Sequence, residues 1–198
     1  MNTTSLAELD RRAVRRSVEL VRQASPADLH RPTPCAGWTL ADLLAHMTAQ
    51  HRGFAAAAAG NGADPAQWSV VPAGVDEYVE AADLVVAAFA AATVADRLFA
   101  LPEISTTLAF PARRAIGFHF IDYVVHSWDV ARCLDLPVDL PPDLIEAARP
   151  IAFAVPNGPE RQTPGAAFQP ALTDDTDGPT TPLDQILARL GRSPQWPR

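Results

Sequence analysis

The sequence of 198 residues contains no lysine, so its 16 basic residues are all arginine, against 23 acidic residues. The formal net charge is −7, and the isoelectric point is near 5.1. Nucleic-acid binding relies on a dense positive face that contacts phosphate groups. The charge balance therefore argues against a nucleic-acid partner.

Long apolar runs and paired cysteines are also missing. The alanine-rich stretch Phe54–Ala59 is far shorter than the ~20 apolar residues of a membrane-spanning helix. The amino terminus, Met1–Thr4, lacks the positively charged segment that opens a signal peptide. The two cysteines, Cys35 and Cys133, lie far apart in the sequence and form no disulfide framework. We expect a reduced, cytoplasmic protein with no membrane partner.

The sequence does contain a helical pattern. Its 198 residues are the length of one domain, and 48% of them are hydrophobic, which is enough for a core. Apolar and small residues recur at steps of three and four in the first segment, which predicts a helix with one buried stripe. Helices are expected over 5–24, 39–59, 76–92, 112–134, 141–153 and 183–190. The segment 98–111 is expected to be extended or irregular. The fold class is therefore all-α, a helical bundle with long connections.

The domain organisation follows from the change in composition near residue 155. Residues 1–155 hold the long helices and are expected to form the bundle. Residues 156–198 are rich in proline, glycine and threonine over much of their length and include one short helix. We expect this second part to be a loop-rich excursion that packs on the same domain.

The helix expected over 112–134 carries the most informative group of polar residues. At 100° per residue, several metal-ligating residue types fall within a band of about 80°: His119, Asp122, His126, Asp129 and Cys133. Asp122 and His126 are four residues apart, so one helix could offer both to a single metal ion. They could also form a simple surface ion pair. Apolar neighbours favour a buried position, where an acid and an imidazole need a partner.

A third ligand would come from the helix expected over 39–59, which carries His46 and His51. On a helical wheel, His51 lies nearer the centre of the apolar stripe, and His46 lies on its flank beside Leu43 and Gln50. Periodicity alone does not choose between the two histidines.

Two motifs in the sequence carry a family resemblance. The stretch Pro32–His46, Pro-Thr-Pro-Cys-Ala-Gly-Trp-Thr-Leu-Ala-Asp-Leu-Leu-Ala-His, resembles the amino-terminal signature of actinobacterial mycothiol-dependent maleylpyruvate isomerase-like proteins. These belong to the wider DinB/YfiT-like metal-binding superfamily. The stretch Asp122–Arg132, with its core Val-His-Ser-Trp-Asp-Val-Ala-Arg, resembles the second signature. The segment Leu183–Arg192 resembles the short ending of a single-domain branch.

The resemblance implies a DinB-like bundle of four main helices that binds a divalent metal, commonly zinc. Carried over by motif, the metal ligands are His46, Asp122 and His126, and His51 does not match a ligand position. The isomerase has glutamate where this chain has Asp122. Three ligands leave one zinc position open, which in the family's thiol-dependent members suits a low-molecular-weight thiol such as mycothiol. Zinc would hold that thiol as the thiolate for attack on an electrophilic small molecule.

This resemblance predicts an isomerase or an S-transferase, but two alternatives remain open at the level of sequence. A metal-bound water could instead make the protein a hydrolase. The bundle could also be a non-catalytic module that binds a small molecule or forms a homodimer. The sequence assigns no catalytic residue beyond the metal ligands.

Other residues have two interpretations each. Asp129 could accept a hydrogen bond from a ligand histidine or serve only as a capping or surface residue. His119 could carry a proton or be structural. Arg132 could meet an anionic group or only complement the helix dipole. The two cysteines are expected to be small core residues, and Trp38 and Trp128 are expected to be packing anchors.

Overall fold

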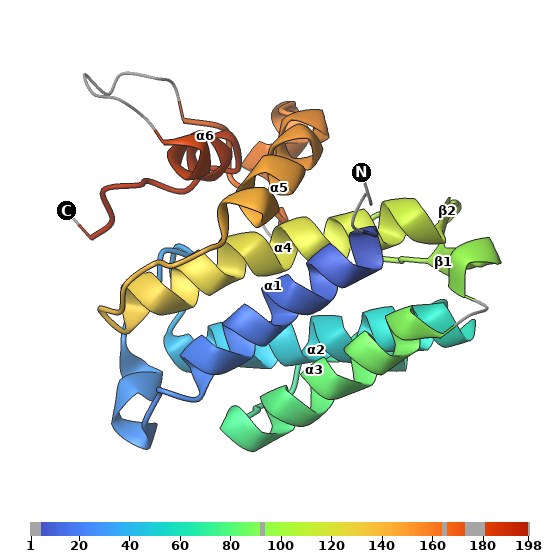
Figure 1. Ribbon diagram of the computed structural model, residues 1–198, viewed down its shortest axis with the longest axis horizontal. Helices are drawn as coiled ribbons and strands as arrows, with labels where there is room; N and C mark the ends of the chain where they lie inside the picture. Colours follow the sequence, from blue (N-terminus) through green and yellow to red (C-terminus); the bar gives the residue numbers. More distant parts are fainter. Residues whose placement is uncertain (1–4, 92–93, 164–165, 173–180, 198) are drawn as a thin grey trace.

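The computed structural model describes residues 5–91, 94–163, 166–172 and 181–197, and within them the protein is mainly helical (Figure 1). The helices are α1 (Leu6–Val21), α2 (Leu40–Ala59), α3 (Val75–Ala90), α4 (Ala112–Cys133), α5 (Pro142–Ala154) and α6 (Pro182–Arg189). The expected all-α class is confirmed. The amino-terminal stretch Met1–Thr4 and parts of the region 156–198 lie outside the described residues.

The ends of the helices follow from local capping chemistry. At the start of α2 the Thr39 side chain accepts from the Asp42 backbone N–H, and the Asp42 carboxylate accepts from the Thr39 N–H. This capping box satisfies backbone donors that the first turn leaves free. The same helix ends at Gly60, whose φ of 95° lies in the left-handed region that glycine adopts without strain. The expected limits of α2 are therefore explained by both caps.

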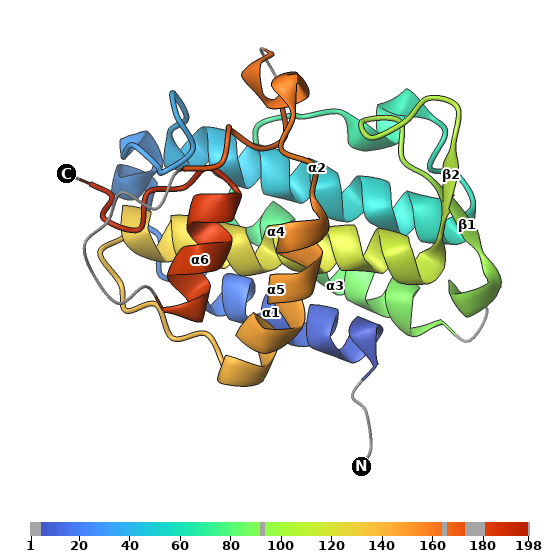
Figure 2. The same ribbon diagram turned by 90° about the horizontal axis from the view of Figure 1, so that it is seen from above.

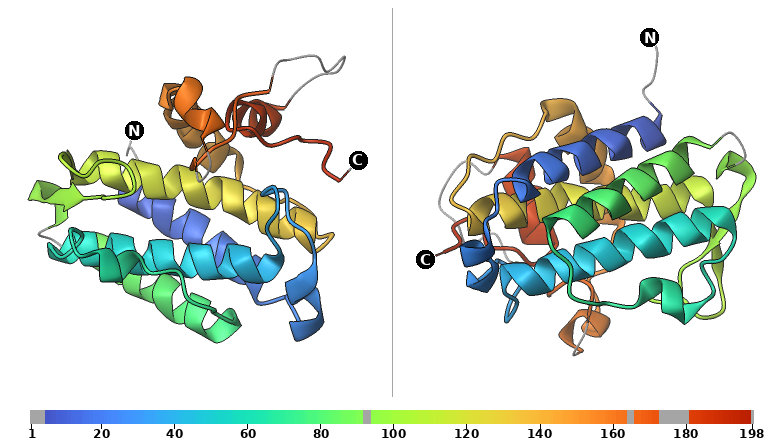
Figure 3. Two further views of the ribbon diagram at one scale, coloured as in Figure 1. Left: turned by 180° about the vertical axis from the view of Figure 1, so that it is seen from behind. Right: turned by 90° about the horizontal axis from the view of Figure 1, so that it is seen from below.

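Four helices form the body of the bundle, and two cover one side of it. Helix α1 packs against α3 and α4, while α2 packs mainly against α3 and also contacts α4. Seen from below, α2 and α3 make up the near face (Figure 3). Helices α5 and α6 pack on each other over the opposite side of α4 (Figure 2). Ile186, Leu187 and Leu190 near the end of α6 belong to the same core cluster as α1, α2 and α4.

A two-stranded hairpin closes one end of the bundle (Figure 1). It lies in the segment 98–111, for which the sequence predicted an extended or irregular structure. Strands β1 (Leu98–Ala100) and β2 (Ala109–Pro111) pair antiparallel, with Phe99 opposite Phe110. Both side chains are buried in a second apolar cluster with Phe54, Trp68 and Phe89. The strands are too short to leave a periodic signal, and this tertiary burial is what holds them together.

The connection from α2 to α3 contains a short 3₁₀ turn, Pro65–Trp68, which brings Trp68 onto α2. The Trp68 indole N–H donates to the Gly62 carbonyl at 2.8 Å. Its ring lies so close to Gly53 that a Cβ there would be 2.3 Å from a ring carbon. Gly53 is therefore required by close approach of the indole.

None of the helices among the described residues has the length and apolar character needed to cross a bilayer.

Candidate metal centre

The fold brings His46, Asp122 and His126 together. Each of them offers one ligand atom, and these atoms lie within 4.8 Å of one another. The His46 and His126 rings are 5.6 Å apart between centroids, and His126 Nε2 lies 3.4 Å from Asp122 Oδ1. Helix α2 supplies one member and α4 supplies two, one helical turn apart. His51, by contrast, has no place in this cluster.

The two histidines have opposite pKa shifts. Burial, and then the neighbouring charge of His126, lowers the pKa of His46 to about 4. Burial alone would also lower the pKa of His126, but the charge of Asp122 and the hydrogen bond to Asp129 outweigh it and raise that pKa well above 6.5. At neutral pH, His46 is therefore a neutral donor, and His126 holds a proton that a metal ion would have to displace.

The hydrogen bonding of His126 leaves one of its ring nitrogens free to face the cluster. His126 Nδ1 lies 2.9 Å from Asp129 Oδ2, one turn further along α4. Asp129 is fully buried, so of its expected roles the hydrogen bond to a histidine is confirmed and the surface role is wrong. A carboxylate on Nδ1 fixes the ring with Nε2 toward Asp122, the arrangement that supports metal-bound histidines. The donor set of two nitrogens and one oxygen suits zinc.

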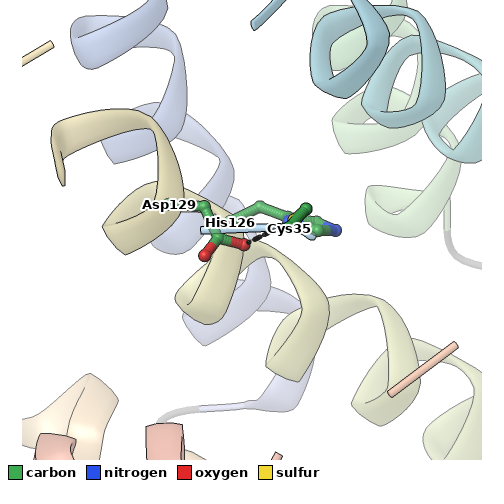
Figure 4. A group of neighbouring side chains, drawn as sticks. All are labelled: Cys35, His126 and Asp129. Atoms are coloured by element: carbon green, nitrogen blue, oxygen red, sulfur yellow. Dashed lines mark hydrogen bonds and ion pairs between the residues drawn. The ribbon is translucent and has the colours of Figure 1, made fainter. Parts of the chain in front are cut away.

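A second group of potential ligands, Cys35, His126 and Asp129, lies on the Nδ1 side of the same ring (Figure 4). Cys35 Sγ donates to Asp129 Oδ2 at 3.3 Å. The Arg192 guanidinium lies 3.3 Å from that same oxygen and 3.3 Å from Cys35 Sγ. A fixed positive charge at this position repels a metal cation. The Arg192 guanidinium therefore takes the place that a metal cation would have in this second group. The candidate metal position is the one between His46, Asp122 and His126.

The Asp129 carboxylate is negatively charged, as its contacts with His126 and the Arg192 guanidinium require. Burial would raise its pKa, but Arg192 and His126 outweigh burial and lower it. Sequence reasoning did not find Arg192, because its contacts join segments 63 residues apart and leave no local pattern. Cys35 and Cys133 both pack on the core as expected, although Cys35 also takes part in these hydrogen bonds.

His51 and His119 belong to a separate buried chain. His51 Nδ1 lies 3.1 Å from His119 Nε2, and His119 Nδ1 lies 2.7 Å from Asp10 Oδ1. All three side chains are fully buried. Burial raises the pKa of Asp10, in spite of His119, and lowers the pKa of His51 well below its ordinary value. These three hydrogen-bonded side chains link α1, α2 and α4, and they have no access to solvent.

Asp10 could have been found from the sequence. It precedes Ala13 by three residues and Ser17 by seven, so it lies on the buried stripe of its helix. An acid at such a position needs a buried partner, and His119 supplies it.

A pocket of about 330 Å³ opens beside His46, one of the three candidate metal ligands. Its lining residues come from the loop before α2, the first turns of α2 and the connection after it: Gly37, Trp38, Asp42, Ala45, His46 and Val70. The Trp38 ring lies 5.0 Å from the His46 ring, centroid to centroid. Trp38 is 37% exposed, so it packs on His46 at the wall of the pocket and not within the core. Trp128 is buried, as expected of a packing anchor.

Arg132 faces the carboxyl-terminal segment and does not line this pocket. Its Nε donates to the Trp196 carbonyl at 2.9 Å, and Nη2 donates to the same oxygen. The guanidinium also lies over the Trp128 ring. These contacts use Arg132 to hold the end of the chain against α4.

The helices and the donor cluster define a helical-bundle protein with a candidate metal centre, and comparisons with known proteins identify its family. Residues 11–131 match the family described as the mycothiol maleylpyruvate isomerase N-terminal domain. The chain therefore belongs to that family.

The chain is also similar to curated relatives and to solved structures. Uncharacterized proteins from two strains of Mycobacterium tuberculosis are each 31% identical over 172 residues, covering 82% of this chain and 84% of the relative. The crystal structure of the mycothiol-dependent maleylpyruvate isomerase matches with a TM-score of 0.57 and 13% identity, covering 77% of this chain and 71% of that chain. A histidine-to-alanine mutant of that isomerase also matches with a TM-score of 0.57. The structural matches establish the shared fold.

Proposed function

We propose that this chain is an enzyme that binds a divalent cation, zinc, through His46, Asp122 and His126 and uses it with mycothiol to act on an electrophilic small molecule. The observation that carries the proposal is that His46 belongs both to the donor cluster and to the wall of the pocket. A molecule in the pocket would therefore lie beside the candidate metal ligands. The family named in the comparisons supports mycothiol as the thiol.

The donor residues fit a zinc ion by their chemistry. His46 is a neutral donor because its pKa is about 4. Asp122 supplies a negative charge that offsets part of the charge of a dication. His126 is held by Asp129 with its other nitrogen toward the cluster. Three protein ligands of this kind are typical of catalytic zinc sites, whereas structural sites usually have four.

When bound, zinc would lower the pKa of a thiol that coordinates it and so supply the nucleophilic thiolate at neutral pH. The chain's own residues would bind and orient the reactants. Trp38 and Val70 are exposed apolar side chains of the pocket, and they would exclude water from the thiol and its target. The pocket volume of about 330 Å³ is near the lower end of the range for small-molecule sites, roughly 300–1,000 Å³.

Two reaction types remain within this proposal, and they differ in the fate of one bond. In both, the thiolate sulfur bonds to an electrophilic carbon of the substrate, and either a π bond at that carbon opens and takes up a proton or a leaving group departs with its bonding electrons. In a transferase, the carbon–sulfur bond remains in the product and the thiol is consumed. In an isomerase, the bond breaks again after rearrangement, and the thiol is recovered unchanged. Mass spectrometry of the products distinguishes the two. We place either activity in the cytoplasm, where thiols stay reduced.

Cobalt substitution tests the role of the thiol. Adding mycothiol to the cobalt-loaded protein should produce a sulfur-to-cobalt charge-transfer band in the near ultraviolet, with release of a proton. The surface variant His30→Ala should behave as the wild type, and His46→Ala should not give the band. A spectrum that titrates near pH 7 without any thiol, and that mycothiol leaves unchanged, would contradict the thiol proposal and favour hydrolysis by metal-bound water.

A further inference from the structure

Arg192 lies beyond the end of α6, yet its side chain is buried in the middle of the network beside the candidate metal centre. Only 6% of its surface is exposed. Its Nε donates to Asp129 Oδ1 at 3.4 Å, and Nη2 donates to Asp129 Oδ2 at 3.3 Å. The guanidinium thus donates hydrogen bonds to both oxygens of the Asp129 carboxylate. This two-point contact defines the orientation of the carboxylate as well as its position.

The backbone after α6 is shaped to deliver this side chain. Gly191 has a φ of 80°, in the left-handed region, and the Arg192 N–H donates to the Leu187 carbonyl at 2.8 Å. A Cβ on Gly191 would lie 2.6 Å from the Gln169 Cβ. Glycine at this position therefore permits the sharp turn that carries Arg192 inward from the end of the helix.

Three segments that are distant in sequence converge on the carboxylate of Asp129: the loop before α2 through Cys35, α4 through His126, and the carboxyl-terminal segment through Arg192. The other polar partners of Asp129, His126 and Cys35, both use Oδ2. Asp129 itself is fully buried. A buried carboxylate is costly unless it is paired and hydrogen-bonded, and Arg192 is the arginine that pairs with it.

We propose that Arg192 is a positioning residue of the metal centre: it holds the Asp129 carboxylate against His126 Nδ1, so that His126 Nε2 stays aimed at the position between His46 and Asp122. This inference rests on the proposed metal centre and adds the carboxyl-terminal segment to it. Partners that orient a metal-bound histidine contribute about 10–100-fold to metal affinity. Loss of the Arg192 guanidinium leaves the Asp129 carboxylate without this cationic partner. The carboxylate then no longer holds the His126 ring in one orientation.

The test is the zinc affinity of purified full-length variants, measured by competition with a chromophoric chelator. We expect Arg192→Met to bind zinc about 10–100-fold more weakly than the wild type. Arg192→Lys keeps a positive charge but loses the two-point contact, so we expect an intermediate affinity. The matched control is Arg161→Met, because Arg161 is equally buried and its side chain donates to backbone carbonyls of Gln169, Arg189 and Val155.

A chemical rescue separates positioning from a general structural role. In Arg192→Ala, millimolar methylguanidinium should restore part of the zinc affinity by filling the space of the missing side chain, whereas methylammonium should restore less. Circular dichroism identifies the folded variants. If Arg192→Met does not fold, Arg192→Lys decides the question by the same measurement. Wild-type affinity in a folded Arg192 variant would overturn the inference and leave the metal centre standing. A wild-type protein that binds no zinc would instead overturn the metal centre itself.

Discussion

The carboxylate of Asp129 lies 2.9 Å from His126 Nδ1, one helical turn away on α4. This contact determines which nitrogen of the His126 ring is free, and the free nitrogen lies 3.4 Å from Asp122. The orientation of one ring therefore connects the buried hydrogen-bond network on one side with the candidate metal position on the other.

The first prediction concerns Asp129. Asp129→Asn keeps the size of the side chain but removes the negative charge that pairs with His126 and Arg192. We expect zinc affinity to fall by about 10–100-fold, measured by chelator competition. Asp83→Asn is the control, because Asp83 forms an exposed ion pair with Arg15. Equal affinities of Asp129→Asn and the wild type would show that this carboxylate does not support the metal.

The second prediction concerns pH. Because the pKa of His126 is raised well above 6.5 while that of His46 is about 4, the metal at pH 7 competes with a proton on His126 and not with one on His46. Metal binding should release about one proton, and affinity should fall about tenfold for each unit of pH below neutrality until His46 also protonates near pH 4. Calorimetry in buffers of different ionisation enthalpy measures the release. Binding without proton release would mean that His126 is already neutral.

The third prediction concerns the buried chain of Asp10, His119 and His51. Asp10→Ala leaves the His119 Nδ1 position without its partner at 2.7 Å. A buried polar group without a partner costs roughly 1–3 kcal/mol, so urea unfolding of the metal-free protein should show that loss of stability. Metal content should stay at the wild-type level. Loss of metal without loss of stability would mean that Asp10, His119 and His51 support the metal centre instead.

The fourth prediction concerns Gly53. A Cβ at this position would lie 2.3 Å from the Trp68 ring, so Gly53→Ala must displace the indole and the connection that carries it. Overpacking of this kind costs about 1–3 kcal/mol. Thermal unfolding and the tryptophan emission of the folded protein measure the two effects. Gly74→Ala serves as a comparison, since its nearest neighbour is the flexible end of Glu77. A Gly53→Ala protein with wild-type stability and emission would mean that the Trp68 contact is looser than described.

The sequence predicted the helices well because their limits depend on local chemistry. The capping box of Thr39 and Asp42 begins α2, and the expected 112–134 helix is close to α4 (Ala112–Cys133). The hairpin of β1 and β2 was left undefined because its strands are held by burial of Phe99 and Phe110 against distant helices. Such contacts leave no signal within the segment itself.

The candidate site was only partly accessible from the sequence. The spacing of Asp122 and His126 predicted two donors on one helical face, and the motif ending at His46 indicated the third, which the structure places beside them. The wheel placed His51 nearer the centre of the apolar stripe than His46. His51 is indeed fully buried, and it pairs with His119 instead of joining the donor cluster. Trp38 is exposed because the loop before α2 turns it toward the pocket. The position of Arg192 depends on how the last helix packs, which no local pattern encodes.

The most direct test of the central claim is the metal content of purified untagged protein, measured by inductively coupled plasma mass spectrometry. The account predicts about one divalent ion per chain in the wild type and loss of that ion in His46→Ala, Asp122→Ala and His126→Ala. His51→Ala should retain the ion, because His51 pairs with His119. Full metal content in the first three variants, or loss of the ion in His51→Ala alone, would contradict the assignment of the metal centre.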